Sequence, residues 1–135
     1  ELTGKIEVLK YVAAVDCGIS INPDLVRGQV LGAIANAVGF ALTEEYHFGS
    51  HGNMTNPSLF DYKILSTRDM PPTEVIVVDN YEPTGPWGAK SVAEIGINGA
   101  MPSIGNAFFD ATGIRLHRTP FTPERVLAAL HGKMI

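Results

Sequence analysis

The sequence predicts an α+β fold in a single domain over residues 1–135, with a long glycine-rich helix, a few strands and a C-terminal helix. Segments 5–15 and 73–81 are rich in β-branched and aromatic residues, whereas the segment after Pro23 places apolar residues three and four apart. The chain is long enough to bury one hydrophobic core. Its strands are too few to close a barrel by themselves.

The first strand, "KIEVLKYVAAV" at 5–15, leads into a loop that contains the turn residues Asp16 and Gly18. The longest helical signal follows this loop. Asn22 is a suitable N-cap, Pro23 fits the first helical position, and Asp24 favours the positive end of the helix dipole.

An apolar stripe continues this helix to about Tyr46 and consists of Leu31, Ile34, Val38 and Leu42. The helix also contains three glycines: Gly28, Gly32 and Gly39. Each glycine inside a helix costs about 1 kcal/mol relative to alanine. We therefore expect another backbone or a ligand to pack closely against them.

The middle of the chain begins with an irregular loop at 47–57, and a short strand or extended segment is expected at 59–65. The segment "TEVIVVDNY" at 73–81 is the clearest buried strand. A breaker, "EPTGPWG" at 82–88, separates it from the last third of the chain.

The last third predicts two helices with a short strand between them. The first helix runs from Pro102 to about Thr112 and ends at Gly113, a favourable residue after a helix. The short strand is expected at 114–120. The C-terminal helix, at 122–131, begins with Thr122 as its N-cap.

Composition excludes several classes of protein. The chain is 45% hydrophobic and 18% charged, with a net charge of −4 and no run of Lys or Arg, which argues against a nucleic-acid partner. No apolar run reaches the roughly 18–20 residues of a membrane helix, and no signal peptide is evident. The single Cys17 excludes an internal disulfide and predicts a cytoplasmic location. The start without Met indicates a piece of a longer protein.

Glu94 is the most unusual acid, because "GAKSVAEIGINGA" at 88–100 surrounds it with glycine, alanine and branched apolar residues. Two interpretations stay open from the residues alone. The carboxylate caps a helix or meets Lys90, or it is a general base prepared for proton transfer by removal from water. Gly88, Gly96 and Gly99 give this stretch backbone freedom and allow close approach of a ligand.

Other polar residues support weaker hypotheses. Gln29, near the start of the long helix, either binds a polar or anionic ligand edge or is an exposed helical side chain. His47 and His51 lie beside Glu44 and Glu45, but neighbouring glycines indicate a loop rather than one helical face. We therefore predict no metal ligated by the protein, and no phosphate-binding glycine loop is present.

Four segments in order resemble the C-terminal part of the molybdopterin-binding large subunit of the xanthine oxidase family of molybdenum hydroxylases. They include "DCGISINPDLVRGQVLGAIANAVGFALTEE" at 16–45 and "NPSLFDYKILSTRDMP" at 56–71. The others are "GAKSVAEIGINGAMPSIGNAFFDATGIRL" at 88–116 and "TPFTPERVLAAL" at 119–130. The likeness covers nearly the whole chain, and the chain resembles a subgroup of bacterial xanthine dehydrogenase-like proteins.

The resemblance implies roles for particular residues. Members of the family carry a glutamate next to molybdenum, so Glu94 is expected to be the catalytic base, taking a proton from a hydroxide-type ligand of the metal. Gln29 matches the glutamine that contacts the pterin. Lys90, with Ser91, Val92 and Ala93, is expected to shape the same cofactor pocket, and the pterin rather than the protein holds the metal.

The resemblance also implies a reaction and partners. The expected reaction is hydroxylation of a purine-like N-heterocycle with water as oxygen source, with aldehyde oxidation as the alternative. Iron–sulfur clusters and FAD are expected in partner domains or subunits, and the rest of the large subunit is expected to complete the site. The fragment alone is expected to be inactive and to self-associate. A third alternative is a non-catalytic assembly module that docks through helix 24–46.

Two departures from the family pattern concern Glu94. Ala93 stands where the family usually has glycine, so its methyl group restricts the backbone if that position needs a positive φ. Ser91 replaces another common glycine, and the frequent proline after the glutamate is missing from "EIGING".

Overall fold

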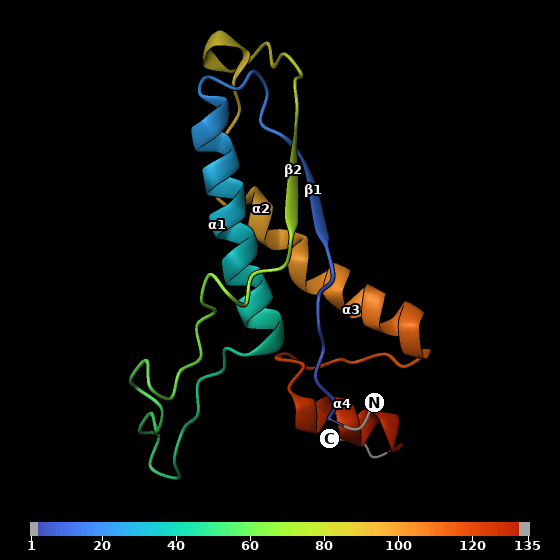
Figure 1. Ribbon diagram of the computed structural model, residues 1–135. Helices are drawn as coiled ribbons and strands as arrows, with labels where there is room; N and C mark the ends of the chain where they lie inside the picture. Colours follow the sequence, from blue (N-terminus) through green and yellow to red (C-terminus); the bar gives the residue numbers. More distant parts are fainter. Residues whose placement is uncertain (1–2, 133–135) are drawn as a thin grey trace.

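The computed structural model describes residues 3–132 and confirms a mixed α+β fold. In Figure 1 the long helix α1 (Pro23–Leu42) stands beside two strands, β1 (Tyr11–Asp16) and β2 (Thr73–Val78). The short helix α2 (Ile95–Asn98) lies between α1 and the strands. It leads into α3 (Ala100–Thr112), and α4 (Pro123–Leu130) lies near the C-terminal end of α1.

The sheet consists of β1 and β2 in parallel, with Tyr11 opposite Thr73 and Asp16 opposite Val78. Parallel strands need a crossover connection, and α1 with the long loop 43–72 provides it. The strand predicted at 5–15 therefore begins later than expected. Residues 5–10 have no ladder partner, because Pro71 and Pro72 precede β2 and proline has no N–H to donate.

Helix α1 begins as predicted, because the Asn22 side chain accepts a hydrogen bond from the Leu25 N–H at 3.1 Å. It ends at Leu42 rather than near Tyr46. The N–H groups of Thr43 and Glu44 both bond to the Gly39 carbonyl, and the Thr43 hydroxyl donates to the Lys63 carbonyl at 2.7 Å. These bonds turn the chain out of the helix and into the long loop.

The core is built around α1. Ile34 and Val38 are almost fully buried and pack with a cluster that comprises Val15, Val30, Ala41, Val75, Ile104, Phe108, Phe121 and Val126. Leu31, which the predicted stripe includes, is 40% exposed. The buried face is rotated towards Val26, Val30 and Ala33, because α2, α3 and β2 all contact α1 on that side.

By length and composition alone, α1 is apolar enough to cross a membrane, a property that it shares with core helices. Its contacts with α2, α3 and β2 are those of a core helix.

The strand predicted at 114–120 is absent from the described residues, and the segment 59–65, predicted as a short strand or extended segment, forms no strand. Its first half is a turn in which the N–H groups of Asp61 and Tyr62 bond to the Ser58 carbonyl, and residues 63–65 have no regular structure. The segment 114–120 is irregular, because its polar groups bind helices instead of a strand: Arg115 donates to Asn106 of α3.

The helices in the last third follow the prediction more closely. Helix α3 ends at Thr112, and Gly113 follows it with a φ of +72°. The Gly113 N–H donates to the Phe109 carbonyl and so completes the helix terminus. Helix α4 begins at Pro123 with the Thr122 hydroxyl accepting from the Arg125 N–H at 3.4 Å. Helix α2 was not predicted, since four residues are too few to show a helical period.

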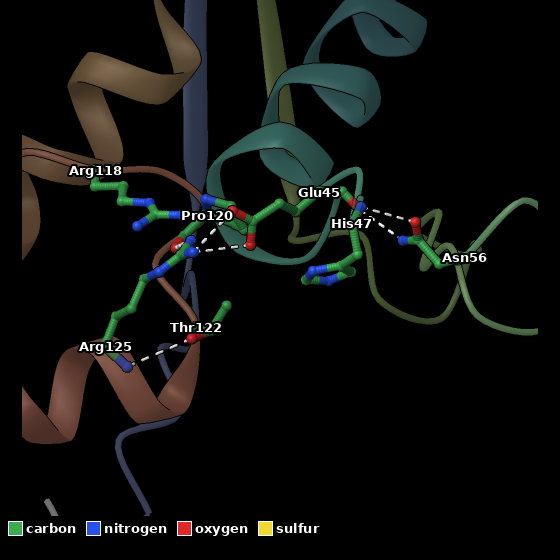
Figure 2. A network of polar contacts seen from close by, with 7 residues as sticks. All are labelled: Glu45, His47, Asn56, Arg118, Pro120, Thr122 and Arg125. Atoms are coloured by element: carbon green, nitrogen blue, oxygen red, sulfur yellow. Dashed lines mark hydrogen bonds and ion pairs between the residues drawn. The ribbon is translucent and has the colours of Figure 1, made fainter. Parts of the chain in front are cut away.

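A polar network fastens α4 to the C-terminal end of α1 (Figure 2). Both Glu45 oxygens accept from one Arg125 nitrogen, at 2.8 and 2.9 Å, and Arg118 adds a longer contact at 3.3 Å. The buried Asn56 side chain bonds to the Glu45 carbonyl and the His47 N–H. The network ties the long loop and α4 to the same point of the core.

Candidate functional site

A depression of about 470 Å³ lies beyond the carboxyl end of β1. Three stretches form its wall: the loop after β1, the first turns of α1, and the segment before α2. Its lining includes Gln29, Lys90, Ser91, Val92 and Ala93. The structure thus brings these five predicted residues together. In α/β sheets this edge is where ligands commonly bind.

Gln29 joins α1 to the segment before α2. Its side chain is exposed, and its amide nitrogen donates to the Ala93 carbonyl at 2.9 Å. Within residues 3–132 the amide oxygen of Gln29 accepts no hydrogen bond, so it remains an acceptor on the lining of the depression. The bond fixes the backbone one residue before Glu94.

Lys90 is held at both its main chain and its side chain. Its N–H donates to the Cys17 carbonyl at 2.7 Å, and its ammonium lies 2.7 Å from an Asp16 oxygen. The hydrogen bond from Lys90, followed by those from Asn80 and the Gly18 N–H, lowers the pKa of Asp16 from 3.8 to about 2. The Asp16 carboxylate is therefore ionised at neutral pH.

Two glycines let the loop after β1 approach the segment that contains Lys90. Gly18 has a φ of +69°, and a Cβ there would lie 2.3 Å from the Gly88 carbonyl oxygen. That oxygen accepts from the Ile19 N–H at 2.8 Å. Gly88 itself has a φ of +77°, a conformation that favours glycine, in agreement with the backbone freedom expected at this position.

Ala93 fits the backbone that it occupies. Among residues 3–132, Trp87 is the only non-glycine residue with a positive φ, so the Ala93 methyl group meets no left-handed strain. At Gly96 the constraint is space rather than backbone conformation. A Cβ there would lie 3.1 Å from the Ala33 Cβ, which is a tight contact. The glycine lets α2 pack directly on α1.

Glu94 immediately precedes α2, and its side chain is exposed in this chain. It makes no capping hydrogen bond, and Lys90 pairs with Asp16 instead, so neither of the two structural interpretations describes it. The burial expected from its apolar sequence surroundings is also not provided by residues 3–132. Ala93 and Gly96, on either side of Glu94, contact α1. Within residues 3–132 the Glu94 carboxylate has no hydrogen-bond or ion-pair partner.

Three polar residues of this region were missed by the sequence reasoning. Asp16 and Asn80 follow β1 and β2, and their position at the carboxyl ends of two parallel strands was the available signal. Ser20 lies on the wall of the depression, and its hydroxyl oxygen is buried without a hydrogen-bond partner within the described chain. No sequence pattern marks such an atom.

The described residues contain no group of three or more His, Cys, Asp or Glu side chains placed to hold a metal ion.

Comparisons with known proteins place these features in context. Residues 1–71 match the family described as "Molybdopterin cofactor-binding domain". The chain is 40% identical over 129 residues to "Probable hypoxanthine oxidase XdhD" of Escherichia coli K12, covering 95% of this chain and 14% of that protein. It is 35% identical over 130 residues to the E. coli aldehyde oxidoreductase molybdenum-binding subunit PaoC, covering 95% of this chain and 18% of that protein.

Solved structures share the fold. The aldehyde oxidoreductase from Desulfovibrio gigas matches with a TM-score of 0.88 and 30% identity, over 96% of this chain and 14% of that one. Quinoline 2-oxidoreductase from Pseudomonas putida 86 matches with a TM-score of 0.83 and 30% identity, over 91% of this chain and 16% of that one. The chain thus spans less than a fifth of the length of each of these relatives.

Proposed function

This chain belongs to the molybdopterin cofactor-binding family of molybdenum hydroxylases, and from that membership we propose that it forms the C-terminal part of such an enzyme's large subunit. The rest of that subunit would supply the remaining walls of the site. The relatives are several times longer than this chain, which supports a role as one part of a larger active site.

The residues of the depression fit a polar, pterin-like ligand. Gln29 offers an amide, Ser91 a hydroxyl and the stretch 91–93 its main chain, and all of them line the depression. The buried Ser20 hydroxyl without a partner is typical of a site completed by a ligand or water. When bound, the molybdenum cofactor supplies the two-electron redox chemistry that adds an oxygen from water to the substrate carbon.

Glu94 is the proposed general base of this reaction. A base must reach the proton that it accepts within hydrogen-bonding distance, and the exposed Glu94 carboxylate has no competing partner within residues 3–132. Its backbone is fixed by the Gln29–Ala93 hydrogen bond and by the packing of Gly96 on α1. The free carboxylate on a fixed backbone is the observation that carries the proposal.

The proposed substrate is a purine-like N-heterocycle, with an aldehyde as the alternative. The higher identity to a protein named for hypoxanthine oxidation than to an aldehyde oxidoreductase favours the heterocycle. The proposed electron route uses iron–sulfur clusters and FAD in partner domains or subunits, and the proposed location is cytoplasmic.

The test is Glu94→Gln in the complete enzyme. Loss of the base is expected to lower kcat by about 10²–10⁴-fold with molybdenum content unchanged, because general-base catalysis contributes that much. Turnover of hypoxanthine and of benzaldehyde is measured beside metal analysis. Asp110→Asn, an exposed acid on α3, is the matched control and is expected to retain activity.

The rival proposal, an assembly module, rests on the open space beside Gly28 and Gly32 of α1. It predicts that Glu94→Gln keeps turnover, whereas substitutions on the exposed face of α1 dissociate the complex. Retained turnover with full molybdenum content would refute the catalytic role of Glu94.

A further inference from the structure

Asp16 gathers three separate segments at the carboxyl end of β1. One of its oxygens lies 2.7 Å from the Lys90 ammonium and accepts from the Asn80 amide at 3.0 Å. The other oxygen accepts from the Gly18 N–H at 2.9 Å. A single carboxylate therefore connects the loop after β1, the loop after β2 and the segment that leads to Glu94.

Backbone hydrogen bonds reinforce this connection. The Lys90 N–H donates to the Cys17 carbonyl, and the Ile19 N–H donates to the Gly88 carbonyl, so the two segments lie against each other on both sides of Gly18, directly after Asp16. Bonds of this kind fix where the segment 88–90 lies. Its side-chain anchor is the Asp16–Lys90 pair, whose side chains are about a third exposed.

The segment from Lys90 to Glu94 is held at two points. Lys90 fixes its beginning, and the Gln29 amide fixes Ala93 through the carbonyl at 2.9 Å. Only Ser91 and Val92 lie between these points. Without the Asp16–Lys90 contact, the Gln29–Ala93 bond would be the remaining side-chain bond that holds this segment within residues 3–132, so the backbone that carries Glu94 is expected to be less firmly placed.

The geometry points to Asp16 as a positioning residue: its contact with Lys90 helps to set the place of Glu94, and Lys90 contributes to the reaction through this contact rather than by touching the cofactor. This inference rests on the proposed role of Glu94. Catalysis is sensitive to such placement, because a displacement of about 1 Å can cost about 10²-fold in rate.

The test is a double-mutant cycle in the complete enzyme: Asp16→Asn, Lys90→Gln and the double variant. Asp16→Asn keeps an oxygen for Gly18 but removes the charge. Each single variant is expected to lower kcat about 10–100-fold, with KM and molybdenum content near the parent values. The double variant is expected to lose no more than the worse single variant, because both changes break the same contact. Lys90→Arg is expected to restore most of the activity.

A second readout does not depend on turnover. Deuterium uptake of segment 88–94, measured by mass spectrometry in the complete subunit, is expected to rise in Asp16→Asn and in Lys90→Gln. The matched control is the ion pair between Lys10 and Glu74, 2.8 Å long, at the opposite end of the sheet. Glu74→Gln is expected to leave kcat and the uptake of 88–94 unchanged.

Three outcomes would overturn the inference: losses that multiply in the double variant, parent-like kcat in Asp16→Asn, or loss of molybdenum in Lys90→Gln but not in Asp16→Asn. Glu94→Gln is measured alongside. If it retains turnover, the base assignment fails, and with it the role given to Asp16 here. If it abolishes turnover while Asp16→Asn behaves like Glu74→Gln, only the positioning inference fails.

Discussion

At the scale of single residues, the least exposed ion pair among residues 3–132 is that of Glu45 with Arg125, whose side chains are 21% and 15% exposed. The hydrogen bond from Arg125 lowers the pKa of Glu45 below its ordinary value of 4.5, against the opposing effect of burial. The pair joins the end of α1 to α4, and its loss should loosen that junction before it affects the rest of the core.

We expect Glu45→Gln to weaken this junction by about 2 kcal/mol, the scale of hydrogen bonds to a charged group. In the complete subunit at pH 7, exchange of the Phe121 N–H, which bonds to the Ala41 carbonyl, should then accelerate about 30-fold. Nuclear magnetic resonance or mass spectrometry of deuterium uptake gives the rate.

The pH dependence follows from the lowered pKa. Ionised Glu45 stabilises the fold above pH 4.5, and this contribution disappears as the pH falls through its lower folded-state pKa. The difference between parent and Glu45→Gln should therefore shrink below pH 4.5. A constant difference down to pH 3, or an unchanged Phe121 rate at pH 7, would contradict this account.

At the scale of elements, sequence reasoning succeeded where the signal is local. The Asn22 cap of α1, the Gly113 terminus of α3 and the Thr122 cap of α4 all lie where turn and cap chemistry predicted them. Sequence reasoning failed for part of the predicted strands, because a segment becomes a strand only if another segment pairs with it. Segment 5–10 has prolines opposite it, and 114–120 binds a helix.

The candidate site shows the same division. The grouping of Gln29 with the stretch 90–93 came from a family resemblance, and the structure places these residues on one wall. Asp16 and Ser20 were not foreseen, since their importance lies in contacts with residues far away in sequence or in the absence of a partner. Composition and periodicity carry no information of that kind.

The open glycines of α1 provide a test at the element scale. A Cβ at Gly28 or Gly32 would meet nothing within 4 Å among the residues that the structure describes, although the sequence predicted close packing there. In the chain alone, Gly32→Ala should raise helicity measured by circular dichroism, since alanine favours a helix by about 1 kcal/mol. In the complete subunit the same change should reduce assembly if a neighbour packs on this face. Equal stabilisation in both would refute close packing.

At the scale of the whole molecule, one face of the sheet is bare. Val12, Ile76 and Val78 are 51%, 45% and 43% exposed, whereas parallel strands in proteins are normally covered on both faces. The long loop adds Leu59 and Phe60, which are 75% and 88% exposed. Surfaces of this kind are typical of contact with other protein.

We therefore expect the isolated chain to self-associate. Size-exclusion chromatography with light scattering should show oligomers whose proportion rises with concentration, and Ile76→Lys should reduce them by placing a charge on the bare face. A monomer that persists at high concentration would contradict this expectation.

The depression depends on bonds between distant parts of the chain: Gln29 with Ala93 and Asp16 with Asn80, each across 64 residues. The stretch 17–29 forms one part of its wall, and the segment 89–93, far away in sequence, has to pack against that stretch to form the rest. If the depression holds part of the cofactor, as proposed, its docking place forms only after the last third of the chain has been made and has packed against α1. The proposal then predicts that folding of this part precedes cofactor loading.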